Sequence, residues 1–203
     1  MRAALTKAFI GWVTKGTPMP SSRYPTIADG TLVQDTNAAM GFPKIPGRPS
    51  PENQVHPLLE YNLGPTFNYQ DASGYLTEVP HLKRSLPQLV VKVDVDGNEV
   101  AGIKSPLQMA PLGTYTGWNV TASGPLKGQV CGNSGGFIPF AKTKAERLAS
   151  GDPRQSLEER YRSHDDYVAA VARAAAKLQR EGYLLAHDAE VMIEQARASD
   201  VLR

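Results

Sequence analysis

Cysteine is almost absent from this sequence: Cys131 is the single cysteine among 203 residues, so no disulfide can form within the chain. The chain also lacks an uninterrupted apolar run of the roughly 18 residues that a transmembrane helix requires. It has no excess of one charge, because its formal net charge is +2. These absences exclude a disulfide scaffold, a membrane-spanning helix and a broad basic field. We therefore expect neither a nucleic acid nor a membrane among its partners.

Proline and glycine, in contrast, are abundant, with 16 and 18 residues. Of the prolines, 15 lie in the first 141 residues, and Pro153 is the single one in 142–203. The last segment also carries 11 basic and 11 acidic residues together with many alanines. This change of composition predicts a boundary near residue 142. We divide the chain into an amphipathic helix at 1–16, a Pro/Gly-rich segment with loops and a hairpin at 17–141, and a helical segment at 142–203.

The opening residues predict an amphipathic helix. Apolar residues recur at the spacing of one helical face, at Leu5, Ala8, Phe9, Trp12 and Val13. Gly16 and Pro18 end the pattern. A helix of about a dozen residues is marginal in water, so the Leu5/Phe9/Trp12 face needs a partner surface. That partner is a larger protein body, the Pro-rich segment of the same chain, or a second copy of the chain.

Residues 17–85 predict turns and short extended pieces, because closely spaced prolines forbid long helices. Ala28, Asp29 and Gly30 have the composition of a turn. Large apolar residues recur along the segment, which favours a wrap over a larger body over independent disorder. These anchors are Tyr24, Ile27, Leu32, Phe42, Ile45, Leu58, Tyr61, Phe67 and Tyr69.

Residues 89–103 carry the clearest β pattern. Val91, Val93 and Val95 alternate with polar residues, which is the period of a half-buried strand. Asp96, Gly97 and Asn98 supply a turn, and residues 100–103 return. We therefore predict a β-hairpin here.

The last segment predicts helices. One covers 143–149 before Gly151, a second opens at the capping box of Ser156, and a third runs from Ser163 to about residue 180. Gly182 is the expected C-terminal cap of the third, and a fourth covers 187–199. The third has an apolar stripe at Tyr167, Val168, Val171, Ala175 and Leu178, and the fourth has one at Ala189, Met192, Ile193 and Ala196. With the hairpin, these helices predict an α+β fold.

The strongest candidate for catalytic chemistry is Ser134 in the string GNSGG at 132–136, which has the spacing of a hydrolase nucleophile elbow. An elbow places its serine between a buried strand and a helix, but Pro139 opposes a helix here. A triad also needs a histidine and an acid in fixed positions, and the upstream histidines His56 and His81 lie in Pro-rich surroundings. We interpret the string as a Gly-rich turn.

Three further patterns receive structural interpretations. Asp94 and its neighbours place Gly97 at the fourth position of a calcium loop, where an EF-hand requires it at the sixth, so a polar turn is expected. His164 with Asp165 opens a helix, where acids favour the dipole. Cys131 is expected to be a packed small residue. We expect no catalytic, cofactor-binding or metal-binding residue in the chain.

Several short strings, in order along nearly the whole chain, resemble the C-terminal part of a family of large bacterial proteins described as alpha/beta-hydrolase domain-containing proteins. They are SRYP at 22–25, ADGTLV at 28–33, FP at 42–43, IPG at 45–47, VDVDGNEVAGI at 93–103, TYTGWN at 114–119, FIPFAKTKAER at 137–147, GDPR at 151–154 and SLEERY at 156–161.

The resemblance implies that the serine nucleophile, the acid and the histidine lie upstream, in an α/β-hydrolase body, and that this chain begins at the helix after the histidine loop. The remainder would be a C-terminal extension that is structural and non-catalytic by itself, docked on the hydrolase body or self-associated through Leu5, Phe9 and Trp12. The complete protein would be a serine-type hydrolase of an ester or amide. Two alternatives are a stand-alone binding or scaffold protein, and an active hydrolase that uses Ser134.

Overall fold

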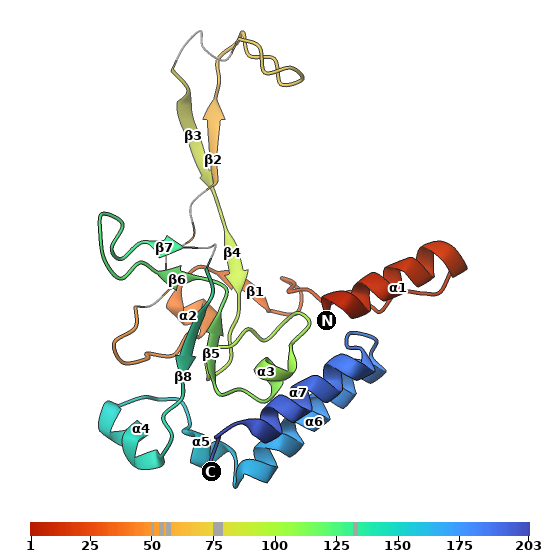
Figure 1. Cartoon of the computed structure of the whole chain (residues 1–203). Coiled ribbons are helices and arrows are strands. Elements are labelled where there is room, and N and C mark those ends of the chain that lie inside the picture. The colour runs from red at the N-terminus through yellow and green to blue at the C-terminus, as the bar shows by residue number, and fades with distance from the viewer. Residues whose placement is uncertain (50, 53–54, 56–57, 75–78, 132–133) are drawn as a thin grey trace.

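The most regular part of the chain is a pair of helices, α6 (His164–Arg180) and α7 (Ala186–Ala198), which pack side by side (Figure 1). The computed structural model describes residues 1–203 except 50, 53–54, 56–57, 75–78 and 132–133. As predicted, the Ser163 hydroxyl caps α6 by accepting from the Asp166 backbone N–H, and Gly182 follows the helix with a φ of 80°. The predicted stripe of α6 is confirmed, with Tyr167, Val171, Ala175 and Leu178 buried. It forms the core against α7 and its neighbours.

Shorter helices surround this pair. The predicted helices are present as α4 (Lys144–Ser150) and α5 (Leu157–Arg160), each with the capping box that its sequence indicates. Two single-turn helices, α2 (Asn37–Met40) and α3 (Pro106–Met109), escaped sequence analysis because they are too short to show a period. Among the helices of the described residues, none has the length and apolar character of a membrane span.

The strands of the described residues form four two-stranded antiparallel sheets. β1 (Leu32–Gln34) pairs with β4 (Leu89–Val91), and β2 (Leu58–Asn62) pairs with β3 (His81–Leu86). β5 (Gly113–Thr116) pairs with β8 (Gly136–Pro139), and β6 (Asn119–Val120) pairs with β7 (Val130–Cys131). Small antiparallel sheets with helices make this an α+β fold, as the sequence predicts.

The predicted hairpin at 89–103 is confirmed next to its turn and wrong further out. An antiparallel Val93–Glu99 bridge closes the turn, and the backbone N–H groups of Asp94 and Val100 donate to the carbonyl oxygens of Asn98 and Lys92 at 2.8 and 3.0 Å. β4, however, pairs with β1, so that Val91 lies opposite Leu32. The return segment forms no strand, because Gly102 has a φ of 91° and turns the chain away. Val95, expected on the buried face, is 82% exposed.

β2 and β3 form an arm that projects from the rest of the molecule (Figure 1). Across it, Glu60 accepts a hydrogen bond of 2.7 Å from Lys83 and a second one from Arg84. The arm exposes Leu58 and Leu82, and elsewhere in 17–85 several predicted anchors are also exposed, whereas Phe42 and Ile45 are buried. The segment therefore anchors itself on this chain mainly through residues 40–45.

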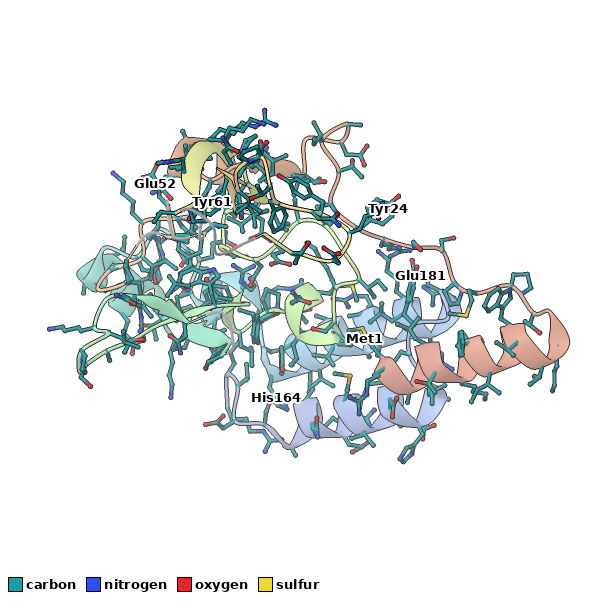
Figure 2. All side chains as sticks on the ribbon, turned by 90° about the horizontal axis from the view of Figure 1, so that it is seen from above. Met1, Tyr24, Glu52, Tyr61, His164 and Glu181 are labelled. Atoms are coloured by element: carbon teal, nitrogen blue, oxygen red, sulfur yellow. The ribbon has the colours of Figure 1, made fainter. Side chains whose placement is uncertain are left out.

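α1 (Arg2–Lys15) is a helix as predicted, and Gly16 ends it with a φ of 66°. Its apolar face is divided, however, which corrects the predicted single face. Leu5 packs against the core cluster of α6 and α7, whereas Phe9 and Trp12 are 53% and 52% exposed. The small side chain of Ala4 is the one that is fully buried, so the helix contacts the body along a line one residue before the predicted stripe. Figure 2 shows Met1 beside the other helices while the far end of α1 projects.

Candidate functional site

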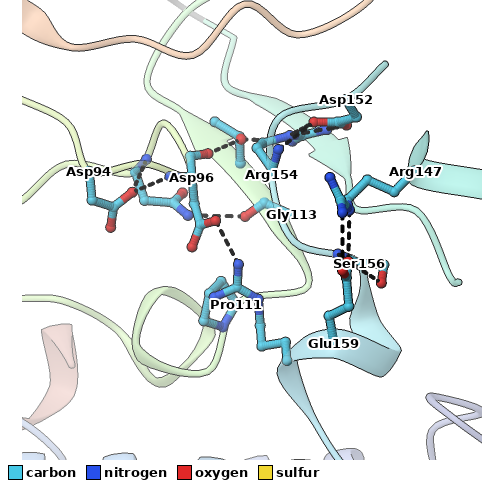
Figure 3. Close-up of polar contacts among 12 residues, drawn as sticks. Asp94, Asp96, Pro111, Gly113, Arg147, Asp152, Arg154, Ser156 and Glu159 are labelled. Carbon is cyan, nitrogen blue, oxygen red and sulfur yellow. Dashed lines mark hydrogen bonds and ion pairs between the residues drawn. The ribbon is translucent and has the colours of Figure 1, made fainter. Parts of the chain in front are cut away.

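A buried polar network joins the sheets to the last third of the chain (Figure 3). At its centre is Arg154, which is 3% exposed. Its guanidinium donates to Asp152 Oδ2 at 2.6 Å and to Thr114 Oγ1 at 2.8 Å. It also donates to the carbonyl oxygens of Ile138 and Pro139, at 3.0 and 3.1 Å. One side chain thus holds strand β5, strand β8 and the loop after α4 together.

The turn at 94–99 occupies the other side of the network. The side-chain amide of Asn98 bonds the backbone edge of β5, as a neighbouring strand would. Its Nδ2 donates to the Gly113 carbonyl at 3.1 Å, and its Oδ1 accepts from the Tyr115 N–H at 2.8 Å. Asp94 Oδ1 accepts from the N–H groups of Asp96 and Asn98, both at 3.0 Å. Asp96 pairs with Arg160 of α5 at 2.6 Å. These carboxylates are occupied by hydrogen-bond donors, which agrees with the interpretation of this loop as a polar turn.

Two acids of the network, Glu159 and Asp152, have lowered pKa values. Hydrogen bonds from Arg147, at 2.8 and 3.1 Å, and from the Ser156 N–H lower the pKa of Glu159 to about 2. Burial raises the pKa of Asp152, but its hydrogen bonds with Arg154 outweigh burial, so that this pKa lies below its usual range. Groups with such pKa values are poor proton donors or acceptors at neutral pH. The network is therefore a structural clamp, and no cluster of potential metal ligands occurs among the residues that could be placed.

Ser134 lies between β7 and β8, and its side chain is exposed. Gly132 and Asn133, which complete the elbow-like string on its N-terminal side, lie outside the described residues. On the other side, β8 begins at Gly136, so a strand follows Ser134 where an elbow requires a helix. Cys131, which the sequence predicts to be packed, lies at the end of β7 opposite Asn119.

The described histidines do not approach Ser134 by a hydrogen bond. His164 is held by two carbonyl oxygens, those of Val201 at 2.8 Å and Arg197 at 3.2 Å. His81 lies on the projecting arm and His187 is exposed on α7, while His56 falls outside the described residues. The structure thus brings together no serine–histidine pair within the part of the chain that it describes.

Beside the clamp lies a cavity of about 410 Å³ that sequence analysis missed. Its walls come from segments far apart in the sequence: α2 and the residues after it, β4, and the end of β5 with the following turn. Phe42 and Trp118 meet there with ring centroids 5.9 Å apart, and Tyr115 adds a third ring. No local pattern marks such a cavity, because each contributing segment looks like ordinary apolar sequence. It is the candidate binding site of the chain.

We predict that Ser134 is chemically inert. A fluorophosphonate that labels activated serines is expected to leave the isolated chain unlabelled, because a strand follows Ser134 and none of the described histidines is bonded to it. Intact-mass spectrometry measures the labelling, with a serine hydrolase of known reactivity treated in parallel. Stoichiometric labelling that disappears in Ser134→Ala would contradict this prediction.

Comparison with known proteins gives one family. The model of a family described as "Alpha/beta hydrolase domain" matches residues 1–194. Comparison with curated proteins found no match, and comparison with solved structures found none either. The match covers nearly the whole chain, including the clamp and the cavity. The chain therefore belongs to this alpha/beta hydrolase domain family.

Proposed function

We propose that this chain is the C-terminal part of a bacterial serine-type hydrolase, whose ester- or amide-cleaving residues lie in an α/β-hydrolase body that precedes it. The observation that carries this proposal is the contrast between a family match over residues 1–194 and a Ser134 that has no histidine bonded to it among the described residues. In this proposal the chain itself is non-catalytic, covers the hydrolase body and shapes the entrance for substrate.

The exposed face of α1 supports this role. Phe9, Trp12 and Val13 are between 52% and 63% exposed. The rings of Phe9 and Trp12 lie side by side, with their centroids 5.9 Å apart. Burying each such side chain is worth roughly 1.5–3 kcal/mol, so a matching surface would bind this face well. We assign that surface to the hydrolase body in the complete protein, and to a second copy when the chain is alone.

The reading frame upstream of residue 1 tests the proposal directly. We expect it to continue without a stop and to encode a G-x-S-x-G string followed by a histidine. In the protein produced from that longer frame, replacing the upstream serine with alanine should abolish esterase activity, whereas Ser134→Ala should leave it unchanged. A promoter and a ribosome-binding site immediately before Met1 would instead favour a stand-alone binding or scaffold protein.

The isolated chain gives a second prediction. Because Phe9, Trp12 and Val13 of α1 are exposed, we expect concentration-dependent self-association, measured by light scattering after size-exclusion chromatography. Replacing Phe9, Trp12 and Val13 together with glutamine should shift the chain to monomer without unfolding it, since all three are exposed. Leu5 is retained because it packs against the core.

The control is Tyr24→Gln with Ile27→Gln, which removes apolar residues that are 67% and 70% exposed outside α1. This control should associate like the unmodified chain. A monomeric unmodified chain over the whole concentration range would show that the α1 face needs no partner.

A further inference from the structure

The polar groups in the wall of the cavity carry information about its ligand. Two carboxylates line it, Asp35 and Glu99, together with the rings of Phe42, Tyr115 and Trp118. Lys, Arg and His are absent from the described residues that line it. Lys92, between the lining residues Val91 and Val93, is exposed and does not contribute to the wall. The cavity is therefore an apolar space with negative charge at its edge.

Asp35 has unused hydrogen-bonding capacity. It follows β1, and its Oδ2 accepts from the Val55 backbone N–H at 3.3 Å. Its Oδ1 is buried and has no hydrogen-bond partner among the residues that the structure describes. A buried carboxylate oxygen without a donor costs free energy, which a ligand that supplies a donor would recover. Asp35 itself is among the residues that line the cavity, so its carboxylate belongs to the wall that a ligand would contact.

We propose that this cavity binds a small primary ammonium ion that carries an apolar body. The ammonium group donates to Asp35 and is attracted by Glu99 and by the faces of the aromatic rings, while the apolar body fills the space beside Met40 and Val93. An anion is disfavoured by both carboxylates, and a hydrocarbon leaves Asp35 Oδ1 without a donor. A volume of about 410 Å³ lies within the range of small-molecule sites.

This inference does not rest on the proposed function, because the cavity lies within this chain and needs no upstream body. The chain itself is therefore the material for the test. Trp118 lines the cavity and reports binding by fluorescence. The other tryptophan, Trp12, is exposed on α1 and is replaced by phenylalanine to remove its signal.

The probes are 2-phenylethylammonium, 2-phenylethanol and propylbenzene, which share an aromatic body and differ in charge and in hydrogen-bond donors. We expect the ammonium ion to bind most tightly and the hydrocarbon most weakly. Asp35→Asn, which keeps the shape of the side chain, should weaken ammonium binding about tenfold, since a charge-assisted hydrogen bond is lost. It should leave binding of the alcohol within about twofold, because the asparagine amide still offers the alcohol an acceptor oxygen.

Asp200→Asn is the matched control, because Asp200 is exposed near the C-terminus and does not line the cavity. It removes the same charge and should leave every affinity unchanged. The proposal would be overturned if the ammonium ion and the alcohol bound with equal affinity, or if none of the three probes bound. That comparison uses the unmodified cavity, so it remains decisive even if Asp35→Asn does not fold.

Discussion

Replacing Arg154 with methionine is expected to lower the free energy of unfolding by about 3–5 kcal/mol, the range for breaking a buried ion pair on one side. The change leaves the Asp152 carboxylate without the partner that keeps it ionised, and it removes one hydrogen-bond donor from each of the carbonyl oxygens of Ile138 and Pro139. Methionine fills much of the same space, so the loss comes from polar groups and not from a cavity. Urea denaturation followed by circular dichroism measures it.

Arg154→Lys should lose most of the same stability, because one ammonium group cannot reproduce the planar fork that bonds four partners. Arg162→Met is the control. That side chain is 93% exposed and its ion pair with Asp166 is 3.7 Å long, so its loss should change stability by no more than about 0.5 kcal/mol. If Arg154→Met lowered the free energy of unfolding no more than Arg162→Met, the network would not be the clamp between the sheets and α5.

Leu178→Ala is expected to cost about 2–5 kcal/mol, since Leu178 is 1% exposed in the core between α6 and α7. Alanine and leucine have similar helix propensities, so the change reports packing and leaves the helix itself intact. The same denaturation experiment measures the loss.

Leu148→Ala makes the same substitution on α4, where the side chain is 61% exposed. It should alter stability by no more than about 0.5 kcal/mol. A Leu178→Ala protein as stable as the Leu148→Ala protein would show that the helical pair does not depend on this core.

The helices other than α2 and α3 could be predicted from the sequence because their signals are local. Thr143, Ser156 and Ser163 each cap a helix through a residue three positions later, and both partners lie in one short string. The residues of the apolar stripe on α6 likewise lie close together in the sequence. The face of α1 could not be predicted correctly, because the apolar residues at 8–13 extend around more than one turn and offer more than one face. The contact with α6 and α7 selects between these faces.

The strand pairing and the cavity could not be predicted in this way. The partner of Val91 is Leu32, and the alternating valines at 91–95 contain no information about a strand that lies so far away. Nothing next to Arg154 in the sequence indicates that it is buried among carbonyl oxygens of β8. The cavity likewise depends on contacts between segments that lie far apart in the sequence.

The docking of α1 has a consequence for synthesis on the ribosome. Its contacts are with residues near the other end of the chain, and the Tyr183 hydroxyl bonds the Ser21 carbonyl across 162 positions. During translation, at about 5–20 residues per second, α1 therefore emerges on the order of 10 s before the surface that receives it. Throughout that interval Ala4 and Leu5 lack the surface on which they pack, and the yield of folded chain depends on how they are protected while α6 and α7 are still being made.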